Sequence, residues 1–234
     1  MVLWNHLSKG LRGAPGDLYR AHVGTGWLPW SAASLASGAV LLVLGALAMP
    51  PTSEVGQVIV ALDQQDAAWL MASASFFLAS VALTMGLPAI LYLLHVRHHV
   101  AAMVGLWIWA VGTIGTSALA AFLILFRATV RVVDISPEDI EQLGRDPVLS
   151  LSLLFVIGAF YLGELIVALV LLRSTVVPRW IPVLLLLHVA LAPVGELLPA
   201  GLQGFQAIVL GLALMGVAVK ASEAWAGTRA STPP

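Results

Sequence analysis

Apolar residues fill six long stretches of the chain, and short segments between them hold most of the charges. A helix needs roughly 20 residues to cross a hydrocarbon core of about 30 Å. Six stretches come close to this length: Trp30–Met49, Ala67–Leu94, Val100–Phe126, Val148–Leu172, Trp180–Leu198 and Gly201–Val219. The pattern predicts an all-α fold, a polytopic bundle of six transmembrane helices over residues 29–220.

Two segments are predicted to lie outside this bundle. Residues 1–28 carry an apolar helical face, with Lys9 and Arg12 off it. The apolar positions are Leu3, Trp4, Leu7 and Leu11. This arrangement favours an amphipathic helix lying flat on the membrane surface, and a frayed tail is the alternative. Residues 221–234 are interpreted as a polar C-terminal tail.

The distribution of Lys and Arg predicts the orientation of the bundle. With six spans, eight of the eleven basic residues share the side that holds both termini: Lys9, Arg12, Arg20, Arg97, Arg173, Arg179, Lys220 and Arg229. The other side holds Arg127, Arg131 and Arg145. Because basic residues concentrate on the cytoplasmic side, both termini are expected to be cytoplasmic.

Helix-start residues occur in the two longer outer loops. In Ser136-Pro137-Glu138-Asp139 a capping Ser precedes Pro at the first helical position and an acid at the third, which predicts a short helix over Pro137–Leu143. Asp146-Pro147 repeats this start for the fourth span. In the first outer loop, Val55, Val58, Ile59 and Leu62 share one helical face, which should lie on the outer leaflet or cover the bundle.

Composition narrows the class of protein. The chain is 60% hydrophobic and 10% charged, whereas about a quarter of the residues of a soluble domain are charged. A net charge of −1 without a basic tract argues against nucleic-acid binding. The absence of Cys excludes disulfides and thiolate metal sites. His95-x-x-His98-His99 lacks further ligands nearby, so no metal and no cofactor are expected.

One cytoplasmic turn resembles a known family. The sequence Leu171-Leu172-Arg173-Ser174-Thr175-Val176-Val177-Pro178-Arg179-Trp180 is similar to the Leu-x-Arg-Ser-x-x-Val/Ile-Pro-Arg-Trp turn between spans four and five of domain of unknown function 4386. The order of loops over roughly residues 30–220 agrees as well. The resemblance implies a six-span protein of a bacterial plasma membrane. It implies no activity.

Glu164 and His188 lie deep within the fourth and fifth predicted spans. At 1.5 Å per residue, Glu164 is about 14 Å from Arg173, and His188 is about 12 Å from Trp180. The two spans form an antiparallel hairpin, so the side chains reach one depth and are expected to pair. Ionisable residues at such depth mark function by default. A structural pair that locks two helices is the alternative.

Glu196 is the reserve candidate, near the outer end of the fifth span. Pro193 and Gly195 just before it are expected to bend the helix and present the carboxylate. One interpretation places Glu196 at the mouth of a cavity together with Gln203 and Gln206. The other has it extend toward Arg127.

Aromatic and small residues complete the prediction. Trp109, Phe160 and Tyr161 lie at the depth of Glu164 and are predicted to line a substrate cavity, with packing or lipid contact as the alternative. Gly105 and Gly112 on the third span mark a seam where helices approach closely.

Three hypotheses about function follow. The first is an intramembrane enzyme with Glu164, His188 and Glu196 as catalytic residues, in which a buried carboxylic acid starts the cyclisation of an isoprenoid and aromatic faces stabilise the cation. The second is a binding or transport protein for a small hydrophobic molecule. The third is a non-catalytic accessory subunit. The expected partners are membrane lipid and a lipophilic small molecule.

Overall fold

The computed structural model describes residues 25–50, 55–94, 99–133, 135–174, 176–195 and 204–230, and all the regular structure in these ranges is helical. A short 3-10 helix, Thr25–Trp27, leads into the first long helix. The helices are α3 (Leu28–Ala48), α4 (Val55–Gln64), α5 (Asp66–Leu94), α6 (His99–Val132), α7 (Pro137–Gly144), α8 (Pro147–Arg173), α9 (Trp180–Gly195) and α10 (Phe205–Ala230).

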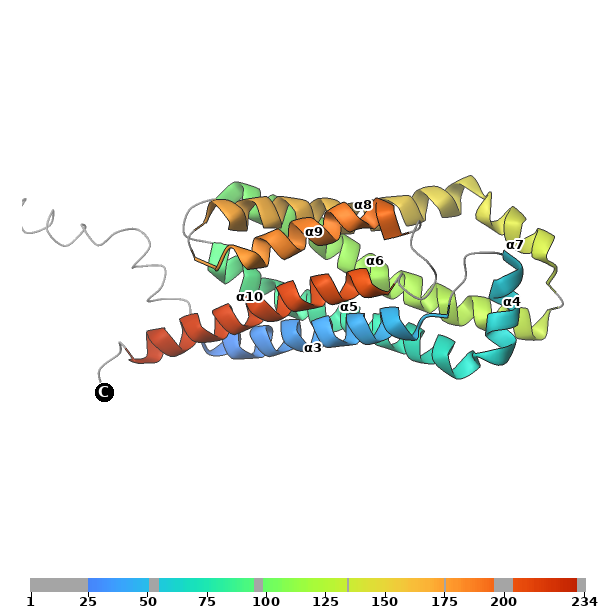
Figure 1. Cartoon of the computed structure of the whole chain (residues 1–234), viewed down its shortest axis with the longest axis horizontal. Coiled ribbons are helices and arrows are strands. Elements are labelled where there is room, and N and C mark those ends of the chain that lie inside the picture. Colours follow the sequence, from blue (N-terminus) through green and yellow to red (C-terminus); the bar gives the residue numbers. More distant parts are fainter. Residues whose placement is uncertain are drawn as a thin grey trace, which may run out of the picture.

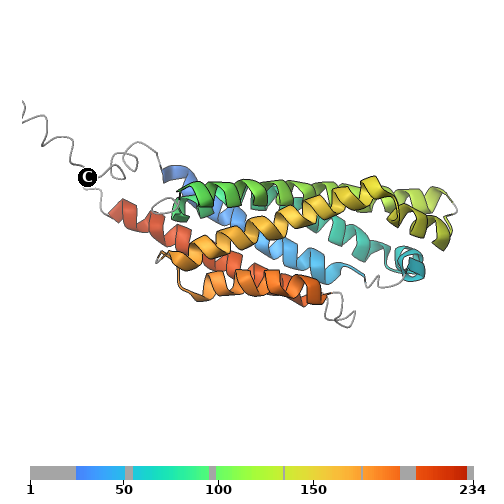
Figure 2. The same ribbon diagram turned by 90° about the horizontal axis from the view of Figure 1, so that it is seen from above.

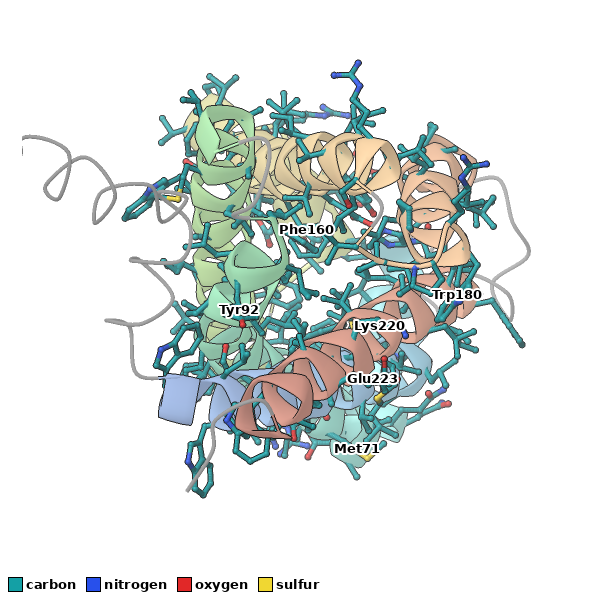
Figure 3. All side chains as sticks on the ribbon, turned by 90° about the vertical axis from the view of Figure 1, so that its left-hand side faces the viewer. Met71, Tyr92, Phe160, Trp180, Lys220 and Glu223 are labelled. Atoms are coloured by element: carbon teal, nitrogen blue, oxygen red, sulfur yellow. The ribbon has the colours of Figure 1, made fainter. Side chains whose placement is uncertain are left out.

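The six longer helices pack as a closed ring. Along the chain, α3 packs on α5, α5 on α6, α6 on α8, α8 on α9 and α9 on α10, and α10 returns to α3. Figure 3 shows this ring along its axis, and Figure 1 shows its elongated shape. In Figure 2, α8 crosses obliquely, beside α9 near the C-terminal end of α10 and beside α6 toward α7. Helix α8 therefore contacts α6 on one side and α9 on the other.

Five of the described helices are long and apolar enough to cross a membrane: α3, α5, α6, α8 and α10. The sixth, α9, is apolar but its described part is only 16 residues long. Each predicted span overlaps a described helix, so the all-helical fold is confirmed. Two helices continue past the predicted apolar ends, α6 to Val132 and α10 to Ala230, because their polar continuations contain no helix-ending proline.

The short helices α4 and α7 contact each other at one end of the bundle, called here the α7 end (Figure 1). The predicted capping box at Ser136 is confirmed: the Asp139 backbone N–H donates to the Ser136 hydroxyl at 3.2 Å, and the Ser136 N–H donates to the Asp139 carboxylate at 2.9 Å. The Asp146 cap is confirmed as well, since its carboxylate accepts the Leu149 N–H at 2.8 Å. On α4, Leu62 is buried, so this helix covers the bundle.

A serine compensates for a proline inside α5. Pro88 interrupts the hydrogen-bond ladder of that helix, and the Ser31 hydroxyl of α3 inserts there. The Ala89 N–H donates to the Ser31 oxygen at 3.0 Å, and the Ser31 hydroxyl donates to the Met85 carbonyl at 2.9 Å. Backbone groups inside an apolar bundle need such partners. This contact connects α3 to α5 next to Pro88.

Candidate functional site

The centre of the site is a pair of side chains on α8 and α9. Nδ1 of His188 lies 3.0 Å from Oε1 and 2.9 Å from Oε2 of Glu164. The Glu164 side chain is 0% exposed and that of His188 is 5% exposed. The predicted contact between these residues is thus confirmed. Pairing provides each polar group with the partner that burial demands.

Glycine packing fixes the depth and lateral position of Glu164. Gly163 of α8 faces the backbone of Trp109 on α6 so closely that a Cβ there would clash with it. Gly112 lies in the same way against the backbone of Phe160, and Gly105 lies against Ile166. The predicted seam on α6 is therefore a close α6–α8 contact. This contact holds α8, the helix that carries Glu164, against α6.

Four aromatic rings connect α6 to α9 through this region. The indole of Trp109 meets Phe160 edge-on at a centroid distance of 6.2 Å, and Phe160 meets Tyr161 edge-on at 5.8 Å. The Tyr161 ring stacks on the imidazole of His188 at 5.4 Å with an interplanar angle of 29°. Phe160 extends from α8 toward the centre of the bundle in Figure 3. The three aromatic residues predicted for the site thus adjoin one another and the pair.

Gln206 lies near the same depth on α10. Gly216 of α10 packs against Trp180 and Ile181 at the start of α9. From these contacts, His188 is about 12 Å along α9 and Gln206 about 15 Å along α10 at 1.5 Å per residue. Four helices of the ring, α6, α8, α9 and α10, therefore bring Trp109, Glu164, His188 and Gln206 to one level within about one helical turn.

Other predicted residues fall outside the described ranges. Glu196 and Gln203 are among them, as are the His95–His98 tract and residues 1–24, so their placement stays a prediction. Pro193 lies in the last turn of the described part of α9. Arg127, toward which Glu196 could extend, binds Asp66.

Sequence reasoning missed a charged cluster at the α7 end. Asp66, at the start of α5, accepts two hydrogen bonds from Arg127 on α6, one of them at 2.7 Å, and Arg131 lies 3.1 Å away. Next to it, the Trp69 indole N–H donates to the Leu123 carbonyl at 3.0 Å. Asp66 faces Arg127 and Arg131, which lie about one helical turn apart on α6. This spacing of the two arginines was the signal available in the sequence.

The buried pair can hold a proton in two ways. When the Glu164 carboxyl is ionised, Nδ1–H of His188 donates to it. When the carboxyl is protonated, its O–H donates to Nδ1. Because both carboxylate oxygens face Nδ1, the remaining ring nitrogen, Nε2, is the atom through which the pair can meet another molecule. The arrangement is that of an acid–base dyad in which the carboxylate orients the imidazole.

Fold and site together define the class of protein. It is an all-helical chain with five described helices of membrane-spanning length and a buried carboxylate–imidazole pair flanked by aromatic rings. No family model, curated protein or solved structure matches the chain. A function for it must therefore be argued from the residues of this site.

Proposed function

We propose that the protein is an intramembrane enzyme that transfers protons to and from an uncharged lipophilic molecule, with the Glu164–His188 pair as its acid–base site. The observation that carries this proposal is the complete burial of a carboxyl group whose two oxygens both face one imidazole nitrogen. A pair serving only as a helix lock is replaceable by leucine at similar volume. Retaining two ionisable groups at this depth favours a chemical role.

In the proposed mechanism His188 is the catalytic residue and Glu164 a positioning residue. Nε2 of His188 donates a proton to a substrate carbon or oxygen, and Glu164 stabilises the imidazolium before transfer and fixes the ring after it. The stacked Tyr161 ring places π electrons beside positive charge. This refines the sequence-based hypothesis, in which the carboxyl group itself met the substrate. Glu196 stays the reserve candidate for a second proton site.

The reaction that best fits these groups is the proton-initiated cyclisation of an isoprenoid. A proton adds to one carbon of a double bond, the resulting cation is attacked by another double bond of the same chain, and a proton leaves a different carbon. Substrate and product are then isomers, and no oxidant or cofactor takes part. The rings of Phe160 and Trp109 provide aromatic faces next to Tyr161 for the cationic intermediates.

For the setting we propose six membrane spans with both termini cytoplasmic, in the plasma membrane of a bacterium. The eight-to-three division of basic residues supports this orientation, and the similarity of the Arg173–Trp180 turn to domain of unknown function 4386 agrees with it. Single-cysteine labelling is straightforward because the chain has no native Cys. Position 138 is expected to react only from outside; reaction only from the cytoplasmic side contradicts the orientation.

The test of the activity is turnover by purified variants that remain monodisperse in detergent. Each is incubated with acyclic isoprenoids of several chain lengths. The variants Glu164→Gln and His188→Gln both keep a similar size and hydrogen-bonding capacity. His188→Gln removes the transferable proton and Glu164→Gln removes the carboxylate that stabilises the imidazolium, so turnover is expected to fall by roughly 10²–10⁴-fold in each. Glu141→Gln, on the exposed helix α7, is the matched control and should retain full activity. Equal turnover in all variants would refute the catalytic role and leave the binding or accessory hypotheses.

A further inference from the structure

Two buried side-chain atoms lack a hydrogen-bond partner in the described part of the chain: Nε1 of Trp109, a donor, and Oε1 of Gln206, an acceptor. Trp109 is only 2% exposed, and a buried indole N–H normally finds a partner. The Trp69 indole shows this in the same bundle, because its N–H donates to a backbone carbonyl. The two unmatched atoms thus differ from the rest of the polar interior and need an explanation.

Both residues lie near the level of the proposed acid–base site along the bundle. The backbone of Trp109 faces Gly163, the residue before Glu164, and its ring is linked to the His188 imidazole by three successive ring contacts. Gln206 lies about 3 Å from the level of His188 along the bundle, given the packing of Gly216 on Trp180. A donor on α6 and an acceptor on α10 therefore lie near the level of the pair on α8 and α9.

The two atoms specify the chemistry of a ligand. Neither carries a charge, so the matching group on the ligand is neutral. Trp109 requires an acceptor oxygen, and Gln206 requires a hydrogen donor; a hydroxyl group is both. The surroundings are apolar, since Leu106 and Leu210 belong to the core cluster that contains Trp109 and Phe160 packs against it. The remainder of the ligand is therefore a hydrocarbon chain. Phenylalanine and leucine would pack at positions 109 and 206 without leaving polar atoms unmatched.

We propose that Trp109 and Gln206 recognise the hydroxyl end of an uncharged lipophilic alcohol bound beside Glu164 and His188; this rests on the proposed function and names its substrate class. The alcohol oxygen accepts the Trp109 indole N–H, and its hydroxyl hydrogen is donated to Oε1 of Gln206. Anchored at this end, the chain of the alcohol runs along the aromatic residues.

Three probes of one carbon skeleton test this recognition: geranylgeraniol, its methyl ether and the corresponding hydrocarbon. Their dissociation constants are measured on the purified full-length protein as mole fractions in the detergent micelle, which removes differences in partitioning. The ether keeps the acceptor and loses the donor, and the hydrocarbon loses both. The unmodified protein should bind the alcohol roughly tenfold more tightly than the ether and the ether roughly tenfold more tightly than the hydrocarbon. Equal binding of the three probes would overturn the proposal.

Two variants assign each preference to its residue. Trp109→Phe should abolish the preference for ether over hydrocarbon, and Gln206→Leu should abolish the preference for alcohol over ether. The control Trp107→Phe, at an exposed position of the same helix, should leave both preferences unchanged. If Trp109→Phe weakens the binding of all three probes equally, the indole contributes only through its shape and the proposal is wrong. If that variant does not fold, the comparison of probes on the unmodified protein still decides.

Binding and turnover separate the two proposals. The preferences among probes do not require proton transfer, so they are measured in Glu164→Gln as well. Selective alcohol binding without turnover would reject the enzyme and keep the alcohol site. Turnover of a hydrocarbon without preference for the alcohol would keep the enzyme and reject this site.

Discussion

The chain holds ionisable groups together in two very different regions. At the α7 end, Asp66 binds Arg127 and Arg131, and these side chains are 18–49% exposed. In the middle of the bundle, Glu164 binds His188, and the Glu164 side chain is fully buried. Both groups connect neighbouring helices. The exposure of each group to solvent determines how much its interaction contributes to stability.

The exposed cluster lies where polar surroundings reduce both the cost and the strength of ion pairs. Its residues extend the ends of α5 and α6 and hold them together. The buried pair has no such screening, so each partner depends on the other. A helix bundle obtains the same connection at lower cost from glycine packing, as between α6 and α8, or from a serine hydroxyl, as between α3 and α5. The buried pair is therefore the region for which we propose a chemical role.

The largest effect is expected from breaking the buried pair. His188→Leu leaves the Glu164 carboxyl without its partner and should lower the free energy of unfolding by about 3–5 kcal/mol, measured by reversible denaturation in mixed micelles. The double variant Glu164→Leu/His188→Leu removes both polar groups and should recover most of this loss. A double variant as unstable as His188→Leu would mean that the pair serves the packing of the helices.

A smaller effect is expected at the glycine seam behind the pair. Gly163→Ala places a methyl group against the Trp109 backbone and should destabilise the fold by about 1–3 kcal/mol in the same denaturation experiment. Gly158 lies on the same helix with nothing within 4 Å of a Cβ. Gly158→Ala should therefore be neutral or stabilising, since alanine is the better helix former. Equal losses at the two positions would contradict the seam.

At the α7 end, Asp66→Asn is expected to have less effect than either change in the interior. The carboxylate is partly exposed, so its ion pairs are weak and screened by salt. The midpoint of thermal unfolding should fall slightly at low ionic strength and match that of the unmodified protein at high ionic strength. A loss as large as that of His188→Leu, unaffected by salt, would show that exposure does not separate the two regions.

The smallest effect is local and concerns the cap of α7. Hydrogen bonds from the Ser136 hydroxyl and N–H hold the pKa of Asp139 below its ordinary value. A lowered carboxyl pKa stabilises the folded helix above the unfolded pKa, and this contribution is lost as the pH falls through the lower folded value. Amide protection at Asp139, corrected for intrinsic exchange, should therefore fall in that acidic range. Ser136→Ala removes the hydroxyl but keeps the backbone N–H, so it should weaken this dependence, whereas Glu138→Gln should preserve it in full.

Much of the fold is readable from the sequence because length and apolarity suffice to place the helices. The Ser136 cap is likewise local, so four consecutive residues predicted α7. The end of α6 was not predicted, because Arg127 and Arg131 read as loop charges until Asp66 is known to lie beside them. The Ser31 contact was missed for a similar reason: Pro88 creates the need for a partner, but only packing shows which helix provides it.

The depth of the candidate site along the helices was predictable from the sequence, but the orientation of its side chains was not. Counting residues from a shared turn placed Glu164 and His188 at one level, and the hairpin made their contact geometrically natural. The stacking of Tyr161 on His188 depends on the rotation of α8 and on side-chain rotamers, which periodicity does not specify. The unmatched atoms of Trp109 and Gln206 could not be predicted either, since the partners available to a polar atom depend on the whole bundle.

Deuterium transfer tests the central claim most directly. Membranes containing the protein or its His188→Gln variant are incubated with acyclic isoprenoid alcohols in deuterium oxide, and the products are examined by mass spectrometry. We expect an isomeric product that carries one carbon-bound deuterium, formed roughly 10²–10⁴-fold more slowly by the variant. Carbon-bound deuterium that appears equally with both proteins, or with neither, would contradict the assignment of proton transfer to the Glu164–His188 pair.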